Sequence, residues 1–106
     1  MSVLVIRASK RFAVRRPVTL HGPGKKRDGL MIELSSEGCR ISNAERGLYA
    51  IDQEVTLVLD EAEHIPGRVR WAHDGFVGIK FARALRQTEL GQLLQTSRAP
   101  EYSLAC

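Results

Sequence analysis

The feature that most constrains the fold is a strand–turn–strand pattern between Ile32 and Ile41. Apolar and polar residues alternate up to Leu34, a Ser-Ser-Glu-Gly segment follows, and the alternation resumes at Cys39. A period of two is typical of a strand with one buried face, and a segment rich in Ser and Gly is typical of a turn. The pattern therefore predicts two strands joined by a tight turn, with Cys39 and Ile41 on the same face.

The same alternation recurs along the chain and gives way to a helical period near the C-terminus. Strands are predicted at residues 18–20, 30–34, 39–41, 54–59, 65–71 and 76–81. From Leu85 the apolar spacing becomes that of a helix, with Thr88 as the predicted N-cap. Five to six short antiparallel strands followed by one helix predict an all-β barrel whose end or side the helix covers.

Strand faces and loops follow from the same pattern. In the strand at 30–34, three apolar residues are predicted to share one face: Leu30, Ile32 and Leu34. Glu33 then faces the other side, and in the strand at 65–71 Trp71 is predicted to face inward. Residues 7–16 lack a clean period, so we expect a loop that orders on ligand binding. Residues 21–29 hold three glycines and a proline, which predicts a second loop.

Length and charge bound the possible functions. The chain has 106 residues, enough for one domain with one core, and its net charge is +4. The first 40 residues hold nine Lys and Arg against three acids, so the field that attracts anions lies there. Two cysteines form no disulfide framework, and neither a signal peptide nor a membrane segment is recognisable. We therefore expect a cytoplasmic protein that does not insert into membranes.

The titratable residues do not form a catalytic or metal-binding pattern. His21, His64 and His73 lie in or beside separate predicted loops, and no Ser or Cys nucleophile stands at a recognisable spacing from them. Cys39 is predicted to be a small core residue. No Cys/His cluster has the spacing of a metal site. We expect that the protein is not an enzyme and holds no metal.

Two segments nevertheless suit a planar, anionic ligand. Arg11 and Arg15 stand four residues apart in a cationic segment, and guanidinium groups bind phosphate oxygens and the O6/N7 edge of guanine through paired hydrogen bonds. In the turn, Glu33 and Ser35 leave the same side of the strand. Gly38 lets the backbone bend and approach a ligand closely. Taken alone, the arginine segment is equally compatible with a solvated basic stretch, and the turn with an ordinary hairpin.

Together, the two segments resemble the PilZ family, whose signature is Arg-x-x-x-Arg followed some twenty residues later by Asp/Asn-x-Ser-x-x-Gly. Arg11–Arg15 matches the first half, and Glu33–Gly38 matches the second except at its first position. Gly67–Phe81 also resembles the last hairpin of the family, so the resemblance covers roughly residues 7–96. It implies one domain over residues 1–106, with a loose tail at 97–106. It also implies a six-stranded antiparallel PilZ-type β-barrel with a C-terminal α-helix.

The resemblance further implies that the ligand is the bacterial second messenger cyclic di-GMP. Arg11 and Arg15 would hold its phosphates and guanine edges, and Ser35 and Gly38 would line the pocket. Glu33 keeps the acceptor of the family's Asp or Asn but carries one more methylene. Two flanking cations complete the set of candidate ligand-binding residues: Lys10 and Arg16.

The leading hypothesis is an adaptor that binds cyclic di-GMP and thereby changes the surface it offers to a protein partner, in motility, exopolysaccharide or biofilm control. The alternative is a degenerate PilZ-like interaction module that has lost the nucleotide. A nucleic-acid-binding barrel ranks last, because only Phe12 is placed to stack on a base. The partner, the choice between one nucleotide and a stacked pair, and the choice between monomer and dimer stay open.

Overall fold

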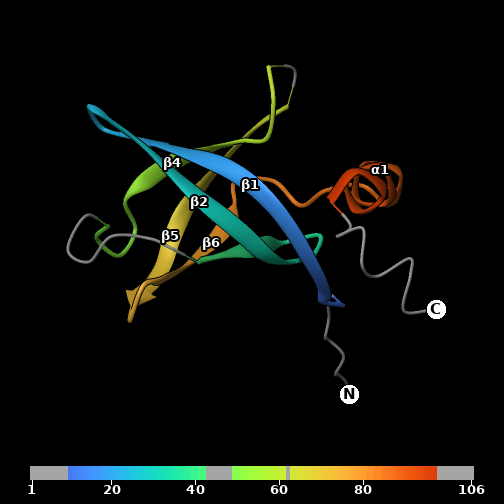
Figure 1. The fold of residues 1–106 in the computed structure, drawn as a ribbon, viewed down its shortest axis with the longest axis horizontal. Helices are drawn as coiled ribbons and strands as arrows, with labels where there is room; N and C mark the ends of the chain where they lie inside the picture. The colour runs from blue at the N-terminus through green and yellow to red at the C-terminus, as the bar shows by residue number, and fades with distance from the viewer. Residues whose placement is uncertain (1–9, 43–48, 62, 98–106) are drawn as a thin grey trace.

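The computed structural model describes residues 10–42, 49–61 and 63–97, which form six strands and one helix. The elements are β1 (Phe12–Gly22), β2 (Lys25–Leu34), β3 (Gly38–Ser42), β4 (Glu54–Val58), β5 (His64–His73), β6 (Phe76–Phe81) and α1 (Gln87–Ser97). The strands close into a barrel in the order β1-β2-β3-β6-β5-β4, and each neighbouring pair is antiparallel. The helix lies beside the barrel, next to β1 (Figure 1). The predicted fold class is confirmed.

One apolar core fills the barrel. Every strand contributes residues to it, among them Leu20, Leu57 and Val69, and Leu93 joins the cluster from α1. Burial of each such aliphatic side chain stabilises the fold by roughly 1.5–3 kcal/mol relative to exposure. The predicted inward face of β3, formed by Cys39 and Ile41, is buried as expected. The core therefore fixes which side chains remain on the outer surface.

The hairpin of β1 and β2 is longer than the sequence pattern predicts. β1 already begins at Phe12, so the expected loop is wrong for residues 12–16, and residues 7–9 lie outside the described part of the chain. β2 begins at Lys25, so the loop predicted at residues 21–29 shrinks to a turn at Pro23 and Gly24. Backbone pairing continues from Leu20 to Gly22 opposite polar residues, because ladder hydrogen bonds do not require apolar side chains.

Two predictions of side-chain position are wrong for local reasons. A register shift between Met31 and Glu33 in β2 buries both Met31 and Leu34, while Ile32 is only half-buried. A bulge of this kind interrupts strict alternation. Thr88 is not the N-cap, because α1 begins at Gln87.

The start of α1 is instead satisfied by an acidic side chain in its first turn. The backbone N–H of Arg86 donates to Oε1 of Glu89 at 2.8 Å, as in one half of a capping box. Leu90 and Leu94 pack against the core cluster beside Leu93. In the described part of the chain, no helix has the length and apolar character that a membrane span requires.

Candidate functional site

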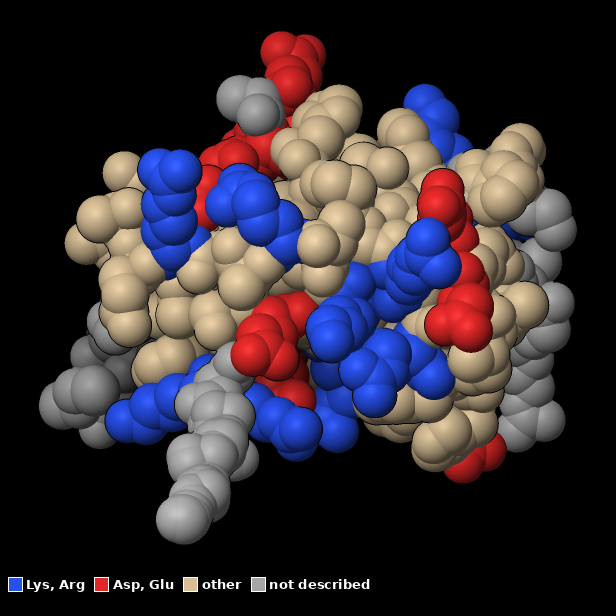
Figure 2. All heavy atoms as spheres, turned by 180° about the vertical axis from the view of Figure 1, so that it is seen from behind, with Lys and Arg blue, Asp and Glu red and all other residues tan. Residues whose placement is uncertain are grey.

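An open cavity of about 490 Å³ lies on the outer surface of the barrel. Its lining comes from the chain just before β1, from β2, β3, β5 and β6, and from the β2–β3 turn. Six charged residues line it: Arg11, Glu33, Glu37, Arg40, Arg70 and Lys80. One face of the molecule carries a gathering of Lys and Arg side chains with acidic groups beside them (Figure 2). Four cations against two carboxylates make this cavity an attractive site for an anion.

Strand register brings the middle of the cavity together. Glu33 on β2 is the partner of Arg40 on β3, Arg40 is the partner of Gly78 on β6, and Gly78 is the partner of Trp71 on β5. Residues that face each other across an antiparallel ladder leave the same side of the sheet. The four positions therefore form one row across the outside of four strands.

Trp71 belongs to this outer row and not to the core, which corrects the prediction that it faces inward. A register shift between Val69 and Trp71 changes the alternation, and Trp71 is half-buried in the cavity wall. Its indole lies directly against Gly78, because a Cβ built at Gly78 would collide with the indole ring. The imidazole of His73 packs beside this indole, and the centroids of the two rings are 5.1 Å apart. The outer surface thus holds a flat aromatic group among cations.

The β2–β3 turn is built around the hydroxyl of Ser35. Its Oγ accepts hydrogen bonds from the backbone N–H groups of Glu37 and Gly38, both at 3.2 Å, and the backbone N–H of Ser35 donates to the carbonyl of Gly38 at 2.9 Å. Such side-chain bonds to nearby backbone groups stabilise a turn without help from a strand ladder. Ser35 therefore shapes the cavity rim through the turn itself.

The glycine of the turn has a different purpose from the one predicted. Gly38 is already paired with Lys80 in the ladder between β3 and β6, and a Cβ at Gly38 would collide with the carbonyl oxygen of Ile79. Close contact between two strands, rather than a bend in the backbone, requires glycine here. Two hydrogen bonds also attach the turn to the end of β6 and to the segment between β6 and α1. The carbonyl of Glu37 accepts from Phe81 N at 2.8 Å, and that of Ser36 accepts from Leu85 N at 2.7 Å.

An ion pair lies within the cavity lining. Nη2 of Arg40 is 3.6 Å from Oε2 of Glu33, and the two side chains are 42% and 28% exposed. Exposed pairs of this length contribute little to stability, about 0–1 kcal/mol. The pair therefore leaves both groups available for exchange with a charged ligand.

The structure brings some of the predicted site residues together and separates others. Arg11, Glu33, Ser35 and Gly38 all line the cavity, although they come from two distant parts of the chain. Arg15 is an exposed residue of β1 and lies outside the cavity lining.

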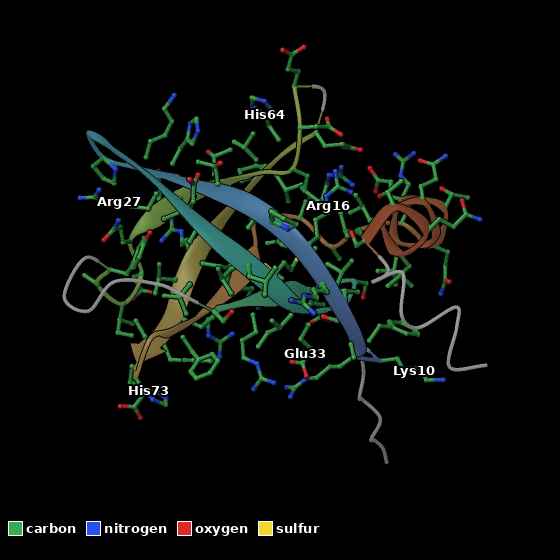
Figure 3. The ribbon with its side chains drawn as sticks, in the orientation of Figure 1. Lys10, Arg16, Arg27, Glu33, His64 and His73 are labelled. Carbon is green, nitrogen blue, oxygen red and sulfur yellow. The ribbon has the colours of Figure 1, made fainter. Side chains whose placement is uncertain are left out.

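The two flanking cations lie elsewhere. Nζ of Lys10 stands 5.8 Å from the centre of the Phe12 ring. Arg16 points toward α1, well apart from Glu33 (Figure 3), and its guanidinium bonds to Thr96. Arg16 therefore contacts the helix and does not line the cavity.

The lining residues that the sequence prediction missed include three cations and the tryptophan: Arg40, Arg70, Lys80 and Trp71. A signal for two of them existed. Arg40 alternates with the buried Cys39 and Ile41, and Lys80 alternates with Ile79 and Phe81, so both must face outward. The missing information was the strand order, which places β6 directly between β3 and β5.

The chain thus folds into a closed six-stranded barrel with a helix beside β1 and a cationic cavity on the outer wall. The family model described as "PilZ domain" matches residues 6–97, and the chain belongs to this family, which comprises receptors for cyclic di-GMP. A crystal structure of the PilZ domain of CeSA from a cellulose-synthesizing bacterium is similar, with a TM-score of 0.63 and 14% sequence identity. The match covers 92% of this chain and 100% of that one, and it shows a shared fold. No curated protein matches the sequence.

Proposed function

We propose that this protein binds cyclic di-GMP in the outer cavity and acts as an adaptor for a protein partner. The observation that carries the proposal is that Arg11 lies in one cavity with Ser35 and Gly38. These residues represent the two separated motifs of a family of cyclic di-GMP receptors. Motility, exopolysaccharide synthesis and biofilm formation are the processes that we propose for its partner.

The charge and size of the cavity suit this ligand. Four lining cations and two lining carboxylates leave an excess of two positive charges, and the two phosphodiesters of cyclic di-GMP carry two negative ones. The volume of about 490 Å³ falls within the range of roughly 300–1,000 Å³ that is typical of small-ligand sites. The half-buried indole of Trp71 offers a flat apolar surface for a purine.

The lining supplies the hydrogen-bonding groups that the nucleotide needs. The guanidinium of Arg11 can bind a phosphate or the O6/N7 edge of guanine through two parallel hydrogen bonds. The carboxylate of Glu33 can accept from N1–H and the N2 amine of guanine. Because the turn is hydrogen-bonded to the segment that leads into α1, a ligand held at Ser35 and Gly38 can change the surface near the helix. In this way binding would become a signal to a partner.

Calorimetric titration with cyclic di-GMP tests the proposal. Arg11→Ala should weaken binding tenfold or more, since a charge-assisted hydrogen bond contributes on the order of 1.5–3 kcal/mol. Arg27→Ala is the matched control, because it removes the same charge from the far end of the β1–β2 hairpin (Figure 3). Equal affinities of the wild type and Arg11→Ala, or no heat of binding at all, would contradict the proposal.

A second candidate is a protein-interaction module without a nucleotide. The observation that favours it is that Glu33, which stands where the family has Asp or Asn, is engaged with Arg40 at 3.6 Å. Glu33→Asp discriminates between the two candidates. If binding appears or becomes tighter in this variant, the site is a receptor weakened by the longer side chain. If neither form binds, the domain is a scaffold.

A further inference from the structure

The guanidinium of Arg40 is incompletely bonded although it lies in the cavity wall. Its ion pair with Glu33 spans 3.6 Å, which is longer than a charge-assisted hydrogen bond of about 2.7–2.9 Å. Its Nε atom is buried and finds no hydrogen-bond partner among the described residues. A buried donor without a partner is unfavourable and normally has a structural or functional reason. Arg40 therefore has hydrogen-bonding capacity that the barrel itself leaves unused.

The surroundings of Arg40 leave room for a ligand. Arg40 stands in the outer row between Glu33 on β2 and Gly78 on β6, and Gly78 has no side chain to shield it. The indole of Trp71 covers Gly78 and lines the same cavity. A ligand that lies against the indole would therefore be within the row that contains Arg40.

We propose that Arg40 is a ligand-binding residue that exchanges partners, from Glu33 in the free protein to the anionic nucleotide in the complex. The inference rests on the proposed function and adds a residue and a regulating contact to it. The exchange is favourable because an exposed ion pair is weak, whereas the planar fork of arginine matches a phosphate or a guanine edge in two hydrogen bonds. Because the ion pair between Glu33 and Arg40 must break before Arg40 can bind the nucleotide, Glu33 lowers the affinity of the site for it.

A double-mutant cycle measures this exchange. Cyclic di-GMP is titrated calorimetrically into the wild type, Arg40→Ala, Glu33→Gln and the double variant. Arg40→Ala should weaken binding about tenfold in the wild-type background, as expected for a lost charge-assisted contact. In the Glu33→Gln background Arg40 does not have to leave an ion pair before it binds the ligand. The loss of affinity caused by Arg40→Ala should therefore be about three to five times larger there than in the wild-type background. Other effects of Glu33→Gln on the ligand cancel in the cycle.

Glu37→Gln is the matched control for the cycle. Glu37 is also a carboxylate of the cavity lining, so its replacement changes the local field by the same charge. The loss caused by Arg40→Ala should be the same with and without Glu37→Gln. Arg40→Lys keeps the charge without the fork and should bind with intermediate affinity. Thermal unfolding of each variant verifies that the barrel is intact.

The outcomes separate this inference from the proposed function. If the wild type binds and Arg40→Ala binds equally well, Arg40 is not a ligand-binding residue and the inference is overturned, while the proposed function stands. The inference is also overturned if the loss is equal or smaller in the Glu33→Gln background, because Glu33 then does not compete for Arg40. If no variant binds cyclic di-GMP, the proposed function fails together with the inference.

Discussion

Arg16 on β1 donates a hydrogen bond of 2.7 Å from its guanidinium to Oγ1 of Thr96 in the last turn of α1. The same side chain is only 15% exposed, and it also donates to the backbone carbonyl of Thr96 at 3.3 Å and to that of Leu59 at 3.4 Å. Asp60 completes the cluster with an ion pair of 3.4 Å. One guanidinium thus joins β1, the β4–β5 hairpin and the helix, and its neighbour Arg15 faces the outer surface.

Arg16→Ala should destabilise the protein, chiefly by loosening α1. Hydrogen bonds to a charged group contribute on the order of 1.5–3 kcal/mol, and the value here should fall near the lower end because Asp60 is exposed. Urea unfolding measures the loss, and amide hydrogen exchange should show reduced protection in α1 before the barrel strands. Lys26→Ala is the control, since an exposed lysine on β2 should change stability by less than about 0.5 kcal/mol. Unchanged protection of α1 in Arg16→Ala would show that the helix does not depend on this contact.

Acid should weaken the start of α1. The backbone N–H of Arg86, and then the side chain of Arg83, lower the pKa of Glu89 below its ordinary value of 4.5. A lowered pKa in the folded state means that the stabilisation is present above the unfolded pKa and is lost as the pH falls through the folded one. The first turn of α1 should therefore lose protection as the pH falls below 4.5.

Glu89→Gln tests the cause of this pH dependence. The amide still accepts a hydrogen bond from Arg86 but does not titrate, so the first turn should be insensitive to pH in the same range. Amide exchange at Leu90 and its neighbours, followed from pH 6 downward, provides the measurement. If the wild type and the variant respond to acid identically, Glu89 does not control this terminus.

Much of the barrel could be predicted because strands such as β4 and β6 place every second residue in the core. The faces of β4 and β6 follow directly from Leu57 and Ile79 and their neighbours, and the Asp74–Gly75 turn has the positive φ angles of 54° and 81° that its residues favour. Polar segments of β1 and β2 could not be recognised, because their strand conformation comes from hydrogen bonds to partner strands. Local sequence carries no signal for such pairing.

Only part of the candidate site could be predicted from the sequence. The two motifs identified Arg11, Ser35 and Gly38, and the structure places all three in one cavity. Arg16 and Trp71 were assigned to the wrong surroundings. Arg16 lies on the inward side of β1 at the end of the barrel, where it contacts α1. The bulge in β5 turns Trp71 outward. Bulges and helix docking depend on tertiary contacts, so one-dimensional periodicity cannot reveal them.

The buried thiol of Cys39 should be chemically inert in the folded protein. Burial raises the pKa of this thiol well above its usual range, so the reactive thiolate is scarce at neutral pH. In a Cys106→Ser background, iodoacetamide at pH 8 should leave Cys39 unmodified in buffer and alkylate it completely in urea. Mass spectrometry gives the extent of reaction. Fast labelling under native conditions would mean that the core around Cys39 opens readily.

Gly78→Ala should displace the indole of Trp71 from the cavity wall. The added methyl group would occupy the space of the indole ring, and overpacking of this kind destabilises proteins by about 1–3 kcal/mol. Because Trp71 is the only tryptophan, its emission spectrum reports the displacement directly, and the affinity for cyclic di-GMP should fall with it. Gly91→Ala is the matched control, because its added Cβ would point into open space beside the helix and alanine favours the helix by up to about 1 kcal/mol. This control should raise stability slightly and leave both emission and affinity unchanged. If Gly78→Ala leaves emission and affinity at the wild-type values as well, the indole neither rests on Gly78 nor contributes to the ligand site.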